Sequence, residues 1–453
     1  KMQALDTSVL KIPYLLSRGD PQAVISYGLD VVRKAGIRLP RKARKHNLIL
    51  EFLRIKGLLK KRTEAEILAH PAMVDENMKK VVEVLNAIGL AAAYIDDTNM
   101  VFLSHLRVLK LSLLHHGLSI HTSVGLITYG VLLVALGDFD SAFAAGELAD
   151  KIAKRFKDRY MEVYVYPYIF AFINPLRRPL QESIDPCLKY YEMAVEAGNM
   201  TSACSNCALY VSVYYYVGLP LEPLVNDSAA IRRCFLNTNE NTMRVMLNIY
   251  LQGVFNLAGR SEDPFEMRGV IVNPDEELSR AKEANNLHIF IIYWTIKLSV
   301  CYILDPTDAR TEATAHELWN HSAESMKNHH LYMIMSFYSG MVAMSLFRRY
   351  RKRKYKRKYK QCIKAIELWQ KKGVPWVYHF LLILQAERCW VEGGTEGEVK
   401  TAFDAAIRTA ARTGFTKDCA LANERIAIYF KETGDEGWSN MYLENARGLY
   451  QEW

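Results

Sequence analysis

The chain has 453 residues, of which 50% are hydrophobic and 24% are charged, so it can bury a large core and does not have the composition of a disordered protein. The net charge of +9 is concentrated between Arg348 and Lys360, where ten of thirteen residues are Lys or Arg, and without these ten the rest of the chain carries −1. This composition argues against a basic surface over the whole molecule, as expected of a general nucleic-acid binder.

The eight cysteines are scattered, which is not typical of a disulfide framework and favours reduced thiols in the cytoplasm. The first 30 residues lack the apolar core of a signal peptide. The longest apolar run, His288–Leu304, is interrupted by Lys297 and is shorter than the ~20 residues of a membrane span, so we predict a buried helix and no membrane span. Because Trp453 ends what looks like a helix, we expect a fragment of a longer cytoplasmic protein.

Apolar residues recur at i, i+3, i+4 and i+7 along almost the whole chain, and this period predicts an all-α fold. Thr63 and Glu66 have the spacing of a capping box, and Asp75 is a predicted N-cap. Residues 1–21 form a poorly assigned N-terminal segment. The main predicted helices cover residues 21–35, 41–60, 75–89, 98–115, 120–136, 141–156, 160–173, 180–197, 200–217, 221–236, 239–258, 276–284, 288–304, 310–328, 330–347, 359–371, 376–393, 396–413, 415–433 and 436–453.

The longest predicted connection without helical periodicity covers residues 260–275 and contains Pro264, Gly269 and Pro274. It divides the predicted helical array into an N-terminal part, residues 22–259, and a C-terminal part, residues 276–453.

Two predicted hairpins share the same spacing of small residues around a Gly-Asp turn. The small residues are Gly130, Gly137 and Ala149 in one pair and Ala427, Gly434 and Ala446 in the last pair. Small residues let two helices approach to about 8–10 Å. The spacing resembles the tetratricopeptide repeat and predicts a right-handed α-solenoid of degenerate tetratricopeptide-like hairpins. Coincidence in an Ala-rich helical protein is the alternative, and it leaves the fold all-α.

No motif for catalysis or nucleotide binding occurs in the sequence. It contains no G-x-x-x-x-G-K-[ST] or G-x-G-x-x-G phosphate loop, no G-x-S-x-G elbow and no H-E-x-x-H zinc motif. We therefore predict a non-enzymatic chain with no catalytic residue, cofactor or metal. A helical enzyme would need convergent polar side chains in a pocket between repeats.

Several clusters invite a functional interpretation, and for each we favour a structural one. Cys204 and Cys207 form a lone C-x-x-C, whereas zinc usually needs four ligands, so we place these thiols in the core without a metal or redox role. The pairs His115–His116 and His329–His330 precede breaks in the helical pattern, where a histidine suits a helix C-terminus. The tyrosines of residues 160–168 and 214–216 are interpreted as core filling.

The basic segment is the sharpest feature of the sequence. Its cations are Arg348, Arg349, Arg351, Lys352, Arg353, Lys354, Lys356, Arg357, Lys358 and Lys360. Such density could neutralise phosphates, with the interleaved tyrosines stacking on bases, or could act as a nuclear import signal or bind anionic lipid. We favour a solvated helix, in which Phe347, Tyr350, Tyr355 and Tyr359 form an aromatic seam.

The order of several segments carries a family resemblance. They are Gly36–Pro40, Gly137–Ala142, Leu219–Leu221, the basic helix before Trp369, Gly414–Glu424 and Tyr442–Tyr450. In this order they resemble the tetratricopeptide-like helical region of very large sensory kinases. Such proteins join a Ser/Thr kinase-like domain, an AAA-type signalling ATPase, the helical region, a GAF domain and often a histidine kinase. The resemblance covers residues 22–453 and not residues 1–21.

The resemblance implies that ATP-binding and phosphotransfer residues lie outside this region. It also implies that a basic helix is a common feature of the family. We therefore expect a non-catalytic scaffold or relay module that binds neighbouring domains of the same polypeptide or other proteins. The alternative is a helical-repeat nucleic-acid binder that uses residues 348–360. The sequence does not indicate the partner or the oligomeric state.

Overall fold

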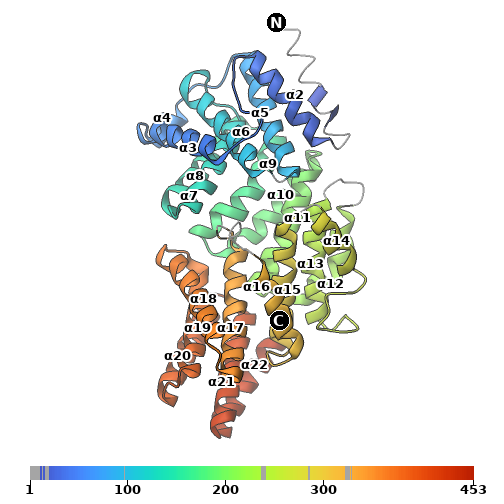
Figure 1. Cartoon of the computed structure of the whole chain (residues 1–453), viewed down its shortest axis with the longest axis vertical. Coiled ribbons are helices and arrows are strands. Elements are labelled where there is room, and N and C mark those ends of the chain that lie inside the picture. The colour runs from blue at the N-terminus through green and yellow to red at the C-terminus, as the bar shows by residue number, and fades with distance from the viewer. Residues whose placement is uncertain are drawn as a thin grey trace. The chain divides into compact units, whose positions relative to one another are not determined.

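The computed structural model describes residues 11–12, 14–15, 20–95, 97–235, 241–283, 286–321, 327 and 329–453. Helices cover most of these residues (Figure 1), and the described ranges contain no β-strand, only an isolated bridge between Ala72 and Leu118. The all-α prediction is confirmed. The chain forms two compact units, Lys1–Ile169 and Phe170–Trp453.

The first unit is built from antiparallel helices that follow one another in the chain. Its elements are α2 (Pro21–Lys34), α3 (Lys45–Lys60), α4 (Glu64–Leu68), α5 (Glu76–Tyr94), α6 (Thr98–Leu111), the π-helix η1 (Ser112–His116), α7 (His121–Ala135), α8 (Phe139–Phe156) and α9 (Arg159–Tyr168). Helix α5 packs against α2 and α6, and α7 packs against α6 and α8. The core therefore runs through the unit between successive hairpins, as stacking of repeats requires.

Side-chain caps fix where these helices begin. The Thr63 hydroxyl accepts from the Glu66 amide, and the Glu66 carboxylate accepts from the Thr63 amide at 2.6 Å, which completes the predicted capping box. Hydrogen bonds from the Thr63 amide and hydroxyl to the carboxylate lower the pKa of Glu66. Asp75 caps α5 and Asp97 caps α6 in the same way. Each cap satisfies amides that have no partner inside the helix.

The second unit continues the pattern of antiparallel pairs. Its elements are the π-helix η2 (Ile169–Ile173) at the boundary, the 3₁₀ turns η3 (Asn174–Leu176), η4 (Leu180–Ser183) and η6 (Pro375–Val377), and α10 (Ile184–Glu196), α11 (Met200–Val217), α12 (Leu221–Arg233), α13 (Asn241–Leu257), α14 (Pro274–Glu283), α15 (Leu287–Leu304), α16 (Ala309–Asn320), α17 (Leu331–Tyr350), α18 (Arg353–Lys371), α19 (Tyr378–Val391), α20 (Glu396–Arg412), α21 (Thr416–Thr433) and α22 (Glu436–Glu452). The right-handed twist of the array stays a prediction.

The two hairpins with matching small residues form as predicted. Gly137 and Gly434 adopt φ of 76° and 90°, the left-handed region that glycine tolerates best. The next residue, Asp138 or Asp435, caps the following helix. The predicted small side chains lie at the helix contact, where Ala149, Ala427 and Ala446 are buried. Close helix packing thus explains the shared spacing.

Some helix boundaries differ from the prediction. The predicted helix 160–173 ends at Tyr168 and continues as a π-helix, next to Pro167, which lacks an amide hydrogen. The predicted helix 310–328 ends at Asn320, and residues 322–326 and 328 lie outside the described residues. The helix predicted from Tyr359 begins at Arg353, so it includes Tyr355 and Tyr359 of the predicted aromatic seam.

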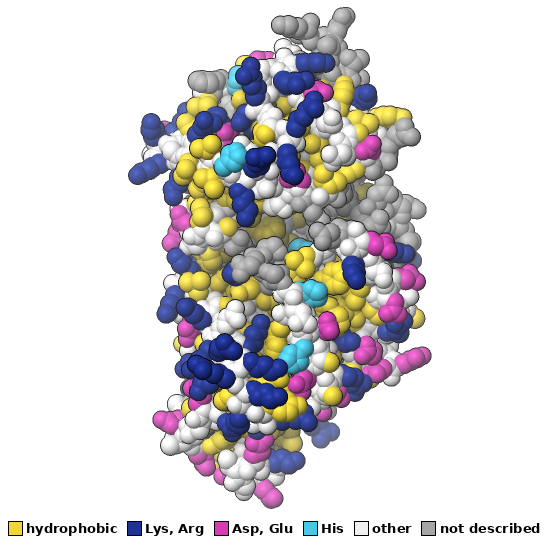
Figure 2. Space-filling view, in the orientation of Figure 1, with side chains coloured by type: hydrophobic (Ala, Val, Ile, Leu, Met, Phe, Trp, Pro, Cys, Tyr) yellow, Lys and Arg dark blue, Asp and Glu magenta, His cyan; other side chains and the backbone are white. Residues whose placement is uncertain are grey.

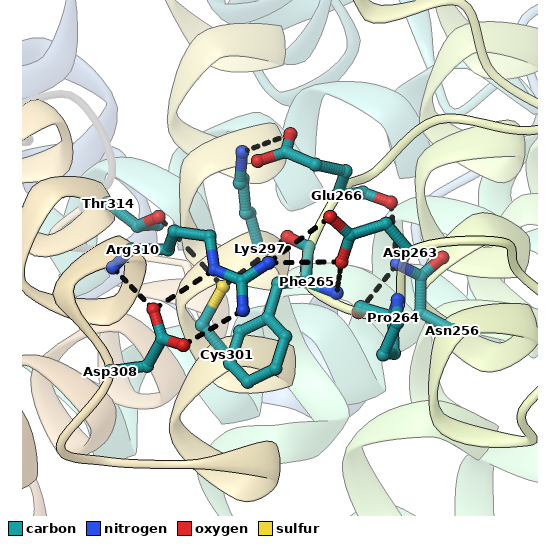
Figure 3. A network of polar contacts seen from close by, with 10 residues as sticks. All are labelled: Asn256, Asp263, Pro264, Phe265, Glu266, Lys297, Cys301, Asp308, Arg310 and Thr314. Atoms are coloured by element: carbon teal, nitrogen blue, oxygen red, sulfur yellow. Dashed lines mark hydrogen bonds and ion pairs between the residues drawn. The ribbon is translucent and has the colours of Figure 1, made fainter.

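Residues 260–275 lie inside the second unit. Along the chain, the boundary between the two units falls between Ile169 and Phe170. The segment between α13 and α14 is packed, since Met267 and Val272 are buried. Arg310 binds Asp263 at 3.1 Å and lies over the Phe265 ring at 3.9 Å (Figure 3). These contacts hold the connection against α15 and α16.

Helix α15 is long and apolar enough to cross a membrane by length and composition, and 67% of it is buried inside the protein. Lys297, at its middle, is 8% exposed and binds Glu266 at 2.8 Å. A core helix passes the same test of length and composition, so this helix is weak evidence for a membrane span.

Segments far apart in the sequence meet within the second unit. The indole nitrogen of Trp376 donates to the Pro175 carbonyl at 2.9 Å, and the Leu221 amide donates to the Trp453 carbonyl at 2.7 Å. The start of α12 is therefore tied to the end of α22, and η3 is tied to η6.

Candidate functional site

The basic segment folds as the end of α17, a tight turn and the start of α18. Arg351 adopts φ of 54°, the left-handed region, and its amide donates to the Phe347 carbonyl at 2.9 Å. The chain thereby reverses direction and α18 packs against α17. The ten predicted cations are distributed over two helix ends and a turn.

The aromatic seam of this segment faces the core. Tyr355 is 2% exposed and Tyr359 is 0% exposed. Their hydroxyls donate to Glu312 at 3.2 Å and to Glu392 at 3.0 Å, and burial raises the pKa of both tyrosines. The interpretation as a helix with an aromatic seam holds for these two residues, and neither ring is available to stack on a base.

Several cations of the segment are neutralised within the protein. Arg348 binds both carboxylate oxygens of Glu432, at 2.6 and 2.5 Å, and lies 3.6 Å over the Trp390 ring. Lys356 lies 3.6 Å from Glu392. Lys358 lies over an aromatic ring, and burial lowers its pKa. Such contacts hold these side chains in fixed positions.

Four cations remain on one exposed stripe of α18, which we call the basic face. Its members are Arg353, Arg357, Lys360 and Lys364, at positions i, i+4, i+7 and i+11 of the helix. Lys360 lies 3.8 Å from Glu392, and the other three form no ion pair with any described residue. Figure 2 shows Lys and Arg side chains gathered on the side of the second unit that carries α18. The stripe is about 17 Å long at 1.5 Å per residue.

The helix dipole adds to the positive charge of the basic face. The first turn of α18 contains Arg353, Lys354 and Lys356 and no acidic residue. A helix N-terminus carries a partial positive charge, so cations there are unfavourable and an incoming anion is favoured. Like charges at i and i+4 add a further small repulsion.

We therefore expect the substitution Arg353→Glu to stabilise the folded protein. The unfolding free energy should rise by about 0.3–1 kcal/mol at low salt, because a carboxylate suits the N-terminus of α18. Lys371→Glu, at the exposed C-terminal end of the same helix, should lower it by a similar amount. Urea unfolding at low and high salt measures both variants. Shifts of the same sign, or shifts that salt does not reduce, would contradict this account of the helix dipole.

A cavity of about 780 Å³ adjoins the turn between α17 and α18. Its lining includes Arg348, Arg349, Arg351, Trp390, Arg425 and Glu432. Arginine remains charged at any ordinary pH and binds carboxylates and phosphates in a two-pronged geometry. The lining also includes the hydroxyls of Thr307 and Ser345 and the carboxyl group of Glu424, whose pKa is raised by burial.

One residue of the cavity lining, Arg425, forms a buried ion pair. Arg425 is 3% exposed and binds Glu387, which is 1% exposed, at 2.5 Å. Burial lowers the pKa of Arg425, but the Glu387 carboxylate more than compensates and holds it above the usual value. Arg425 also lies 5.3 Å from the centre of the Trp390 ring. Trp390 thus contacts two guanidinium groups and is fixed in orientation.

The predicted cysteine and tyrosine clusters lie mostly in the core of the described part of the chain. Cys204, Cys207 and Tyr214–Tyr216 are buried, which confirms their placement in the core. In the tyrosine cluster of residues 160–168, Tyr164 and Tyr166 are buried, whereas Tyr160 and Tyr168 are exposed. No group of three or more His, Cys, Asp or Glu among the described residues could hold a metal ion.

The histidine pairs lie at opposite kinds of helix end. His116 ends η1, as expected for a residue at a helix C-terminus. The prediction for His329–His330 is wrong, because this pair immediately precedes the N-terminus of α17. His330 is 2% exposed, donates from Nδ1 to the Ala171 carbonyl at 3.2 Å, and has its pKa lowered to about 4 by burial. Burial as a neutral ring, rather than the helix dipole, explains its position.

The sequence signals find only part of this site. Lys364 lies outside the predicted basic segment, although one more helical turn from Lys360 would have included it. Trp390, Arg425 and Glu432 carry no local motif, and only the fold brings them to Arg348.

Comparisons with known proteins add little to this description. No family model matches the chain, and no curated protein matches it. Among solved structures, the chain is similar to a circular tandem repeat protein with novel repeat topology and enhanced subunit contact surfaces. The two share 13% identity over 100% of this chain and 90% of that chain, with a TM-score of 0.17. A TM-score this low does not indicate a shared fold, so we assign the architecture from the helices described above.

Proposed function

We propose that the chain is a protein-interaction module that binds an acidic segment of a neighbouring domain or partner protein through the basic face of α18. In this proposal it acts as a scaffold or relay, without bond chemistry, in a multidomain signalling ATPase or kinase. Stacked helical hairpins commonly present extended surfaces to partners. The order of segments that resembles the helical region of sensory kinases supports the signalling context.

One observation carries the proposal: three of the four cations of the basic face have no acidic partner among the described residues, while Arg348, Lys356 and Lys360 approach glutamates. An isolated helix with this pattern is destabilised by its own charges. An acidic ligand would relieve that repulsion. The positive charge of α18 therefore lowers the stability of the helix but favours binding of a negatively charged partner.

An acidic protein segment fits the basic face better than a nucleic acid does. Binding of single strands usually combines cations with exposed aromatic rings on which bases stack. Tyr355 and Tyr359 are buried, and Tyr350 is 37% exposed with its hydroxyl donating to Glu312 at 2.9 Å, so at most one of these three rings is exposed for stacking. Phosphate contacts by the cations alone would give weak binding without base stacking.

Binding of a polyglutamate peptide tests the proposal. We expect the fourfold variant Arg353→Gln, Arg357→Gln, Lys360→Gln and Lys364→Gln to reduce affinity for this peptide at least ~10-fold at ~50 mM salt, because each exposed contact contributes a few tenths of a kcal/mol or more. Fluorescence anisotropy of a labelled peptide, titrated over a range of salt concentrations, measures the effect.

A matched control carries the same change in net charge elsewhere in the second unit. Arg408→Gln, Arg412→Gln, Lys431→Gln and Arg447→Gln alter four exposed cations of α20, α21 and α22 and should leave peptide binding unchanged. Equal losses in both fourfold variants would show non-specific attraction and would remove the basic face as the site. Tight binding of single-stranded RNA with a steep salt dependence, in place of the peptide, would favour the nucleic-acid alternative.

The non-catalytic part of the proposal has its own test. Purified chain incubated with ATP and magnesium should release no phosphate above the buffer blank. Turnover that co-purifies with the chain and disappears in a variant of the cavity, such as Arg349→Gln, would refute a purely binding role.

A further inference from the structure

The cavity beside the turn between α17 and α18 has the size of a small-molecule site. Its volume of about 780 Å³ lies within the range of roughly 300–1,000 Å³ that is usual for ligand pockets. Its lining comes from α15, α17, α19, α21 and the chain segments that follow α15 and α17. All of these belong to the second unit, so the cavity is formed within one compact unit.

Two of the four arginines in the lining are neutralised by glutamates. Arg348 binds Glu432 through hydrogen bonds of 2.6 and 2.5 Å, and Arg425 binds Glu387 at 2.5 Å. These two guanidinium groups help to form the wall of the cavity without adding an uncompensated charge.

The other two arginines of the lining keep most of their hydrogen-bond donors. Arg349 and Arg351 are exposed, and neither forms an ion pair with any residue that the structure describes. The guanidinium of Arg351 donates from Nη1 to the Val391 carbonyl at 3.5 Å, and that of Arg349 lies 5.2 Å from the centre of the Tyr350 ring. A guanidinium group has five N–H donors, so most of the donors on these two side chains can bind a ligand.

The carboxylates of the lining are engaged by other donors. Glu432 is bound by an arginine, as described above, and Asp305 accepts from the amide and the hydroxyl of Thr307, both at 2.7 Å. Glu424 accepts from the Tyr450 hydroxyl at 2.8 Å, and burial raises its pKa. The positive charge of the two exposed arginines is therefore not cancelled by an ion pair within the described lining.

Much of the remaining lining is apolar. It includes Leu304, Pro306, Val391 and Ile428, which can contact the non-polar part of a ligand. Ser345 adds a hydroxyl whose oxygen is buried and has no hydrogen-bond partner among the described residues. Because a buried polar atom without a partner is unfavourable, a ligand that bonds to this hydroxyl would gain free energy.

We propose that this cavity binds a small organic phosphate monoester, with its phosphate group against Arg349 and Arg351 and its apolar body against Leu304, Val391 and Ile428. A phosphate monoester carries a charge of about −1.5 to −2 at neutral pH, which matches two uncompensated arginines better than the single charge of a carboxylate does. Arginine also binds phosphate oxygens through two parallel N–H···O hydrogen bonds. The site is separate from the basic face of α18 and does not depend on the proposed binding of an acidic protein segment.

Isothermal titration calorimetry with phenyl phosphate tests the proposal, because this probe combines a phosphate monoester with a small apolar ring. We expect a single saturable site at ~50 mM salt. Phenyl phosphate should bind at least ~10-fold more tightly than inorganic phosphate, which lacks the ring, and than benzoate, which carries one charge. No saturable binding of phenyl phosphate, or equal affinity for the three anions, would overturn the assignment.

Substitutions in the full chain locate the site. Arg349→Gln combined with Arg351→Gln should weaken binding of phenyl phosphate at least ~10-fold, because both unpaired guanidinium groups are lost. The matched control, Arg408→Gln combined with Arg412→Gln, changes two exposed arginines of α20 and should leave the affinity unchanged. Arg349→Gln alone should give an intermediate loss, and its thermal unfolding should match that of the parent chain. Equal affinities of the double variant and its control would refute the cavity as the site.

The fourfold variant of the basic face separates this site from the proposed peptide site. It should bind phenyl phosphate as tightly as the parent chain does, whereas the double variant of the cavity should keep its affinity for polyglutamate. Loss of phenyl phosphate binding in the fourfold variant would place the anion on α18 and overturn the assignment to the cavity. Failure of polyglutamate to bind would refute only the peptide site, since the two probes are measured independently.

Discussion

Acidification from pH 7 to pH 4 is expected to destabilise each compact unit, and one buried histidine in each should contribute about 3 kcal/mol of that loss, because a shift of one pKa unit corresponds to 1.36 kcal/mol. The residues are His105 in the first unit and His330 in the second. Burial lowers the pKa of each ring from 6.5 to about 4.

The direction follows from proton uptake. Below pH 6.5 an unfolded chain protonates these histidines, whereas the folded protein does so only near pH 4. The unfolded state therefore binds more protons between these values, and stability falls as the pH falls through this window. His105 is 6% exposed and His330 is 2% exposed, so solvent does little to reduce the effect.

Urea unfolding at pH 7, 6, 5 and 4 measures this dependence. Replacement of either histidine by Asn keeps a donor near the Nδ1 position and removes the titration. Each variant should lose stability less steeply between pH 6.5 and 4 than the parent chain does, whatever its stability at pH 7. Parallel curves for the parent and both variants would show that other groups control the acid response.

Loss of Arg425 is expected to destabilise the second unit by roughly 3–5 kcal/mol, the usual penalty for leaving a buried charge without its partner. Arg425→Met keeps much of the side-chain volume but leaves the Glu387 carboxylate, which is 1% exposed, without its ion-pair partner. The double variant Arg425→Met with Glu387→Leu removes both charges and should recover most of the loss.

A double-mutant cycle by urea unfolding measures the coupling of the two residues. Because the chain has two compact units, hydrogen exchange of peptides from α19 and α21 should be measured alongside to locate the loss. Arg408→Met, an exposed arginine on α20, is the matched control and should change stability little. If the double variant is as unstable as Arg425→Met, the buried pair does not account for the effect.

The fold follows closely from the sequence because helix signals are local. Apolar period, Gly-Asp turns and caps such as Thr63 act within a few residues, and most predicted helices appear at the expected places. Predicted helix boundaries are wrong where the sequence has no local start or stop signal. Helix α18 begins at Arg353 without a capping side chain, since its N-cap residue is Lys352. The left-handed conformation before it is adopted by Arg351 rather than by a glycine.

The site is less predictable because it depends on contacts between distant residues. The charge of residues 348–360 is visible in the sequence, but the pairing of Arg348 with Glu432 spans 84 positions. Nothing local indicates which cations are neutralised and which remain exposed. The same holds for Cys234, whose carbonyl accepts from the Cys204 thiol 30 positions away.

The contact between Leu221 and Trp453 also bears on how the second unit folds. In an open helical array each repeat touches only its neighbours, so the ends fray and unfolding spreads inward from them. Here the main chain at the end of α22 is anchored to the start of α12 at 2.7 Å. Closing that contact joins residues far apart in the chain, which raises the contact order and slows folding. In return, opening of the last helix also breaks its contact with α12, so α22 is held by more than its neighbour in the chain.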